Sequence, residues 1–253
     1  MTPTWTPDHW LIVTGGLLGL ALLGYTIWEA VSGAPSAKAH NEASRIRLLR
    51  LTSLLLWGMS LIAGIAWILS GRGFAILGPG SGWGAALAWG VAALVIAYLG
   101  YCTHRLKTDP EECAKTARHL EKSGGLEIFM PQTRRGYRYA QLAALSAGPT
   151  EEFLLRAFAI TTLALFLPVW AAAGIAGLGF MLLHLYQGWR GVLRTGPITL
   201  VLTLMYLVSD SILPGILLHS AVDMIGVAQM QLLLKARHKA AATGTPLNHR
   251  LAT

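Results

Sequence analysis

Long runs of apolar residues, separated by short polar segments, form the main pattern along this chain. A bilayer core about 30 Å thick requires about 20 apolar residues in a helix. Runs that approach this length lie near residues 10–31, 51–70, 83–102, 138–160, 169–187, 196–209 and 215–234. The sixth run is short, so we expect it to be tilted, half-buried or joined to a neighbour. The pattern predicts an all-α fold, a polytopic transmembrane helical bundle with about seven spans.

Composition agrees with a membrane protein. Hydrophobic residues make up 54% of the chain and charged residues only 13%, whereas soluble domains average about 25% charged residues. The net charge of +8 does not indicate nucleic-acid binding, because the basic residues lie in short segments between apolar runs, where membrane topology requires them. The two cysteines, Cys102 and Cys113, have neither the number nor the spacing of a metal knuckle or a disulfide framework.

The distribution of basic residues predicts an orientation. Of the 20 Lys and Arg residues, 18 fall in four segments, which are 33–50, 103–138, 188–195 and the tail after 234. With seven crossings, all four segments lie on the same side of the membrane. The positive-inside rule then places the N-terminus outside and the C-terminus in the cytoplasm, and we expect a bacterial inner (plasma) membrane.

The same partition divides the chain into four regions. They are N-terminal transmembrane helices (1–103), a cytoplasmic loop with an amphipathic helix (104–137), a membrane core that carries the candidate chemistry (138–235) and a flexible cytoplasmic tail (236–253). In the loop, Asp109-Pro110-Glu111-Glu112 is typical of a helix start, and Ser123-Gly124-Gly125 of its end. We therefore interpret Glu111 and Glu112 as a solvated helix cap and not as a catalytic acid pair.

Ionisable residues inside a span indicate function, because each costs several kcal/mol at bilayer depth. Glu152 and Arg156 are four residues apart, so they share a helix face and can pair. Glu151 points about 100° around the helix from Glu152, so it has no partner in its own helix. This unpaired carboxylate is a candidate general base. Gly148-Pro149 just before it can break or kink the helix. The alternative is that both acids only neutralise Arg156.

Two later spans each contribute a histidine. His184 lies four residues after Phe180, so the two rings share a helix face, although a lone histidine is also compatible with a satisfied core residue. His219 and Asp223 are likewise four apart, and the carboxylate can fix the tautomer and direction of the imidazole. The alternative is a buried pair that locks two helices together. Taken together, three separate spans deliver groups that are useful for hydrolysis.

These three motifs resemble, in order, those of the CPBP family of intramembrane glutamic endopeptidases, the CAAX proteases and bacteriocin-processing enzymes also called the Abi family. The family pattern is Glu-Glu-x-x-x-Arg, then Phe-x-x-x-His, then His-x-x-x-Asn or Asp. Similar flanking segments are Pro131-Gln132-Thr133-Arg134-Arg135, His184-Leu185-Tyr186-Gln187-Gly188 and Ser211-Ile212-Leu213-Pro214. The resemblance covers about residues 126–234.

The resemblance implies a protease site around a water-filled cavity, with no cofactor or metal. Glu151 would activate water together with His184, while His219 and Asp223 would stabilise the oxyanion. Supporting roles would fall to Glu152, Arg156 and Phe180. A carboxylate cannot donate a hydrogen bond to an oxyanion, so we expect Asp223 to orient His219. The substrate would be a membrane protein or peptide, prenylated or not.

Three other functions stay open at this point. Glu151, His184 and His219, with Asp223 as a fourth, could ligate zinc in a metalloprotease, although the chain contains no HExxH motif. The chain could instead be a non-catalytic membrane scaffold or immunity protein that keeps these residues for stability. A proton-coupled transporter also uses buried acids and histidines, but it would show repeated halves, and the sequence has no evident repeat.

Overall fold

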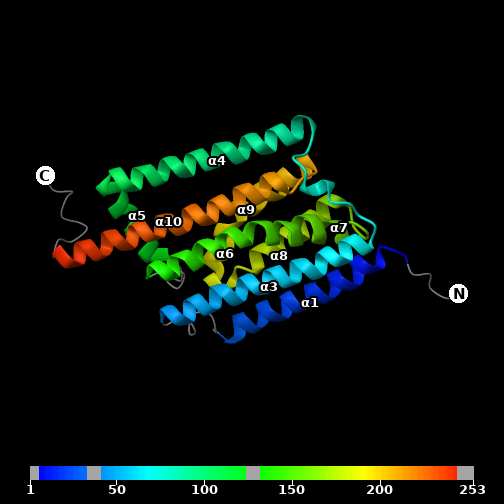
Figure 1. Ribbon diagram of the computed structural model, residues 1–253, viewed down its shortest axis with the longest axis horizontal. Helices are drawn as coiled ribbons and strands as arrows, with labels where there is room; N and C mark the ends of the chain where they lie inside the picture. Colours follow the sequence, from blue (N-terminus) through cyan, green and yellow to red (C-terminus); the bar gives the residue numbers. More distant parts are fainter. Residues whose placement is uncertain (1–5, 33–40, 124–131, 244–253) are drawn as a thin grey trace.

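The computed structural model describes residues 6–32, 41–123 and 132–243, and within them every regular element is helical. In chain order these elements are α1 (His9–Ser32), α3 (Glu42–Leu69), η1 (Ala75–Leu77), α4 (Gly82–Thr108), α5 (Pro110–Ser123), α6 (Arg134–Glu152), η3 (Phe153–Ala159), α7 (Ile160–Leu163), α8 (Val169–Leu182), η4 (Leu185–Gln187), α9 (Gly188–Ser209) and α10 (Leu213–Thr243). Figure 1 shows the long helices running alongside one another in an elongated bundle. The predicted all-α class is confirmed.

Helices α6 and α10 lie at the centre of the bundle. Helix α6 packs against α10 on one side and against α3 on the other, while α4 packs against α10 and α1 against α3 (Figure 1). The largest buried cluster of apolar side chains joins α1, α3, η3, α8 and the segment before α10, through Leu11, Trp67, Phe158, Phe180 and Ile212. The candidate motifs of α6 and α10 therefore lie on two helices that pack directly against each other.

Five helical segments are long and apolar enough to cross a membrane. They are 9–28, 42–69, 82–108, 185–209 and 213–236. Their outward faces expose large apolar side chains such as Leu20, Leu54 and Leu94, which suits contact with acyl chains. Five is fewer than the predicted number of about seven, because α8 has only 14 residues and α6 carries many polar residues. The chain is an integral, multi-pass membrane protein.

Several helix boundaries differ from the prediction. Helix α3 begins at Glu42, well before the predicted residue 51, because Asn41 caps it by accepting a hydrogen bond from the backbone N–H of Ser44 (2.9 Å). The run predicted as short, 196–209, is a helix of 22 residues that begins at Gly188. The apolar pattern underestimates both helices, because their first turns carry polar residues that reach past the lipid.

The predicted ends of α8 and α10 also differ from the observed ones. Helix α8 ends at Leu182, so His184 follows the helix instead of lying within it, as the predicted run 169–187 required. Helix α10 continues to Thr243, so it enters the segment 236–253 that was predicted as a flexible tail. Residues 244–253 lie outside the described part of the chain.

The polar loop contains the helix that the sequence predicts. Asp109 caps α5, since its Oδ1 accepts hydrogen bonds from the backbone N–H groups of Glu111 (3.0 Å) and Glu112 (3.2 Å). The hydrogen bond from Arg105 to Oδ2 (2.7 Å), together with these N–H groups, lowers the pKa of Asp109 below its ordinary value. The interpretation of Glu111 and Glu112 as a helix cap is confirmed. Residues 124 and 125, predicted to end this helix, lie outside the described residues.

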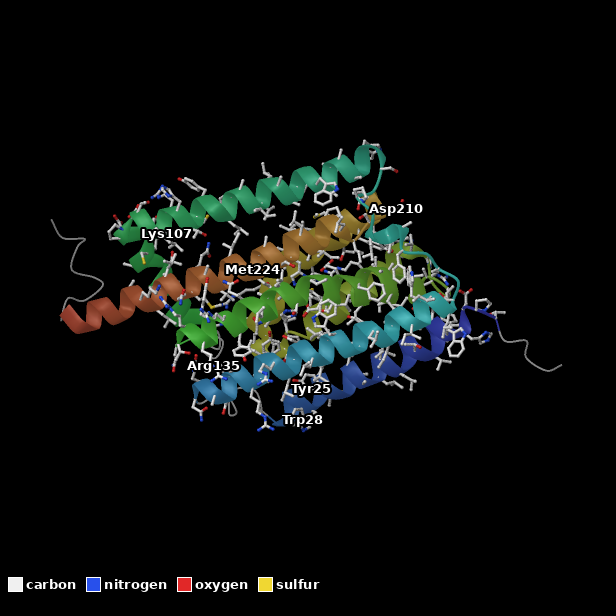
Figure 2. The ribbon with its side chains drawn as sticks, viewed as in Figure 1. Tyr25, Trp28, Lys107, Arg135, Asp210 and Met224 are labelled. Atoms are coloured by element: carbon white, nitrogen blue, oxygen red, sulfur yellow. The ribbon has the colours of Figure 1, made fainter. Side chains whose placement is uncertain are left out.

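The two ends of the bundle differ in charge. Figure 2 labels Lys107 and Arg135 at the end where α10 finishes, and Asp210 at the opposite end. Asp210 ends α9 in a left-handed conformation (φ 50°). At the basic end, the exposed rings of Tyr25 and Trp28 pack with centroids 5.9 Å apart (Figure 2). Paired aromatic rings at one level of a bundle are typical of a membrane interface.

Candidate active site

Helix α6 changes its winding at the first motif. The α-helix ends at Glu152 and continues as the π-helix η3, and such widened turns are frequent at functional sites. The expected break at Gly148-Pro149 does not occur, because α6 runs through Pro149. Instead, Gly148 allows a close approach of α6 to α10, since a Cβ atom there would collide with the Ser220 hydroxyl.

One side of the His219 ring is closed by a buried ion pair. His219 Nδ1–H donates a hydrogen bond to Glu152 Oε1 at 2.8 Å, and Arg156 Nη1 lies 3.3 Å from the same oxygen. The Glu152 and Arg156 side chains are each only 1% exposed. Gly215 leaves room for this carboxylate, because an added Cβ would lie 3.1 Å from Glu152 Oε2. A carboxylate accepts but does not donate, so Nδ1 carries a proton and Nε2 faces away from Glu152.

The other side of the same ring is open and acidic. His219 Nε2 lies 3.8 Å from Glu151 Oε2 and 3.6 Å from Asp223 Oδ2. Both distances are too long for direct hydrogen bonds. The Glu151 side chain is 20% exposed and that of Asp223 is 39% exposed. The adjacent acids Glu151 and Glu152 therefore lie in different surroundings, as their angular separation on the helix predicts.

Phe180 connects the second motif to this cluster. Its ring centroid lies 4.8 Å from that of His184 and 5.7 Å from that of His219. His184 Nδ1–H donates a hydrogen bond to the backbone carbonyl of Phe180 at 2.9 Å. Because a carbonyl oxygen only accepts, this bond fixes the neutral tautomer of His184 and leaves its Nε2 as an acceptor.

Arg156 is buried with little hydrogen bonding. Its guanidinium carbon lies 4.5 Å above the Phe180 ring, which is the geometry of a cation–π contact. Although Arg156 Nη1 is close to Glu152, the angle does not make a hydrogen bond, and no guanidinium nitrogen has a hydrogen-bond partner among residues 6–32, 41–123 and 132–243. The charge of Arg156 is thus compensated by one carboxylate and one aromatic face.

All seven predicted residues meet in one connected cluster. Glu152 holds His219 Nδ1, whereas Asp223 lies 3.6 Å from Nε2, so the expectation that Asp223 orients this ring stays a prediction. His184 joins the cluster through Phe180, and in the described part of the chain its observed contacts do not include Glu151. The imidazole nearest to Glu151 is that of His219.

Sequence reasoning named Gly148 only as a possible helix break and did not name Gly215, although both small residues give the site its shape. Gly148 and Gly215 each admit a neighbouring helix or carboxylate that a larger residue would displace. The available signal was their position, since Gly148 lies three residues before Glu151 and Gly215 four residues before His219. Small residues in membrane helices are enriched where two helices approach closely.

The zinc alternative has limited geometric support. Within the described residues, no group of three or more His, Cys, Asp and Glu side chains is arranged to hold a metal ion. The Nδ1 atoms of both site histidines are engaged in hydrogen bonds. His219 Nε2 is the ring nitrogen that lies near the two partly exposed carboxylates, those of Glu151 and Asp223.

Comparison with known proteins identifies the same region. Residues 137–225 match the family model described as Rce1-like: Type II CAAX prenyl endopeptidase Rce1-like. No curated protein and no solved structure matches the chain. The matched segment contains all three motifs, and the resemblance to CAAX proteases that they indicated is confirmed.

Proposed function

Because residues 137–225 belong to the Rce1-like family of CAAX prenyl endopeptidases, we propose that this chain is an intramembrane endopeptidase that uses a glutamate-activated water. The substrate is a membrane-associated or lipidated protein or peptide. One observation carries the proposal. The partly exposed carboxylate of Glu151 lies beside His219 Nε2, while Glu152 holds the opposite nitrogen of that ring.

In this proposal, Glu151 is the general base. Its oxygen faces the open side of the site, where it takes a proton from a water molecule whose oxygen attacks the scissile carbonyl carbon. His184 Nε2 is free to accept the second hydrogen of that water, because its Nδ1–H is bound to the Phe180 carbonyl. The water is thereby oriented by two acceptors, one on α6 and one in the turn that follows α8.

The oxyanion is stabilised by His219. With both nitrogens protonated, its Nδ1–H remains bound to Glu152 and its Nε2–H donates to the oxyanion. Asp223, at 3.6 Å from Nε2, stabilises this imidazolium. The proton held by Glu151 then passes to the leaving amide nitrogen, the C–N bond breaks, and the carboxylate of Glu151 is restored. Glu152, Arg156 and Phe180 keep His219 in place.

We further propose about seven crossings, with the N-terminus outside and the C-terminus inside a bacterial plasma membrane. The five long apolar helices supply most of these crossings, and α8 together with the α6–α7 element supplies the others. The basic residues at one end of the bundle, including Lys107 and Arg135 (Figure 2), support a cytoplasmic position for that end.

Glu151→Gln tests the mechanism. In proteoliposomes that hold the full chain and a library of prenylated and unmodified peptides, we expect peptide cleavage to fall 10²–10⁴-fold, the contribution typical of a general base. Glu111→Gln is the matched control, because Glu111 is an exposed acid in the cap of α5. The unfolding temperature of both variants should equal that of the wild type.

Three results would contradict this proposal. Undiminished cleavage by the Glu151→Gln variant would show that Glu151 is not the general base. Loss of activity on chelation, restored by zinc and accompanied by stoichiometric zinc in the purified protein, would establish the metalloprotease. Membrane proteomes identical in fragment content between wild type and Glu151→Gln, with the biological function intact, would establish a non-catalytic scaffold.

A further inference from the structure

A second concave site lies at the start of α6, at the basic end of the bundle. This open cavity has a volume of about 570 Å³ and is lined by Arg134, Arg135, Arg138, Tyr139 and Leu142. Figure 2 shows Arg135 at this end, away from Asp210. Three of the five lining side chains are guanidinium groups, so the cavity has a strongly positive wall.

Among the described residues, no acidic side chain pairs with the arginines of this cavity. Within the described residues, the observed ion pairs include none of Arg134, Arg135 and Arg138. Glu42, the acid adjacent to this helix start, is already engaged by the Thr133 hydroxyl at 2.7 Å and by Arg45 at 3.5 Å. Three like charges so close together repel one another, and an anion relieves that repulsion.

The ring of Tyr139 lies near two arginine side chains beside this cavity. The guanidinium carbons of Arg135 and of Arg50, which comes from α3, lie 6.0 Å and 5.9 Å from the centroid of its ring. The ring thus brings a fourth basic side chain from a neighbouring helix close to the cavity. Planar guanidinium groups suit phosphate, because they can donate two parallel hydrogen bonds to it.

The cavity is continuous with a lipid-facing stripe. Leu142 follows Arg138 by four residues and Leu145 by seven, so the three side chains lie on one face of α6. Both leucines are exposed, and we expect the stripe to lie along an acyl chain. A positive cavity followed by an apolar stripe has the amphipathic pattern of a phospholipid, whereas a soluble anion would not use the leucines.

This cavity is separate from the candidate active site. Arg138 precedes Glu151 by 13 residues of helix, which is about 20 Å at 1.5 Å per residue. If a substrate has three residues after the scissile bond, that segment spans only about 10 Å when it is extended. The carboxylate of such a substrate would not reach these arginines while its peptide bond lies at Glu151.

We propose that this cavity binds the phosphate group of an anionic phospholipid, with one acyl chain lying along Leu142 and Leu145. The lipid anchors the start of α6 at the membrane surface. Basic pockets between helices on the cytoplasmic side are the type of site that binds acidic lipid headgroups.

The test uses the full chain in detergent, with phosphatidylglycerol titrated and bound lipid counted by native mass spectrometry. The cavity variant is Arg134→Gln/Arg135→Gln/Arg138→Gln. The control variant is Lys107→Gln/Arg190→Gln/Arg194→Gln, which removes the same charge from exposed residues outside the cavity. We expect phosphatidylglycerol affinity to fall at least about tenfold in the cavity variant and to stay within about twofold of the wild type in the control.

Two further arms identify the source of the phosphate. Phosphatidylcholine, whose headgroup is neutral overall, should bind at least about tenfold more weakly than phosphatidylglycerol, and glycerol 3-phosphate should not bind measurably. Equal losses in the cavity and control variants would show diffuse surface attraction and overturn the site. Binding of glycerol 3-phosphate as tight as that of the lipid would overturn the phospholipid assignment. The single variant Arg138→Gln, which leaves the first turn of α6 intact, must show a smaller loss in the same direction.

Discussion

On one side of the His219 ring, the side chains of Glu152, Arg156 and Phe180 are almost completely buried; on the other, those of Glu151 and Asp223 remain partly exposed. The closed side contains the short hydrogen bond and the ion pair, so it fixes the ring. The open side has longer separations and partly exposed carboxylates, and it is the side where we propose that water and substrate bind. The difference suggests that stability and chemistry are assigned to opposite faces of one imidazole.

Arg156→Met should cause the largest loss of stability, because it removes the cation from the closed side of the His219 ring. It leaves the Glu152 carboxylate buried without its cation, and removing one partner of a buried pair typically costs about 3–5 kcal/mol. We expect a correspondingly lower stability in thermal or denaturant unfolding of the purified chain. Arg105→Met is the matched control, because Arg105 also pairs with an acid four residues away, but at the surface. Equal destabilisation by the two variants would show that burial is not the source of the effect.

Gly148→Ala should disturb the framework that carries both sides. Its Cβ would collide with the Ser220 hydroxyl and lie close to the backbone of α10, and overpacking of this kind typically costs about 1–3 kcal/mol. Unfolding measurements should show this loss. Gly100→Ala on α4 is the control, since no atom outside its own helix lies near its added Cβ. That variant should be neutral or slightly more stable, because alanine favours helix over glycine. A neutral Gly148→Ala would contradict the close helix contact.

Asp223→Asn should affect the open side least. Asp223 is partly exposed and makes no short hydrogen bond to His219, so we expect unfolding to change by less than about 0.5 kcal/mol. Cleavage should remain within about tenfold of wild type, because the amide can donate to an oxyanion where the carboxylate cannot. Asp223→Leu has neither the carboxylate of aspartate nor the donating amide of asparagine, so it should lose more activity. If Asn and Leu are equally inactive, the negative charge of Asp223 is itself required.

Spacing within a helix predicted the pair of Glu152 and Arg156, but it did not predict the partner of His219. The i, i+4 positions of Glu152 and Arg156 and the different direction of Glu151 follow from helix geometry alone, and the structure has both. The partner of His219 could not be found this way. Asp223 is close in sequence, yet Glu152 reaches Nδ1 from another helix, because the contact between α6 and α10 decides which acid is near.

The predicted boundaries of several helices were wrong for a related reason. An apolar run marks the part of a helix inside lipid, whereas hydrogen bonding and capping decide where the helix itself begins and ends. Helix α3 therefore extends back to its Asn41 cap, and α9 begins at Gly188, before its apolar run. Conversely, α8 stops at Leu182 despite a continuing apolar pattern, which frees His184 to turn its ring toward Phe180.

The sequence by itself determined the all-helical membrane character, the solvated cap of α5 and the set of seven residues that gather at the site. These follow from hydropathy, local spacing and motif order, which are properties of short stretches of chain. Only the tertiary structure decided which acid holds His219, which acid stays partly exposed, and which glycines allow the helices to meet. Those outcomes depend on distances between α6, α8 and α10, and such distances are set by packing among segments far apart in the chain.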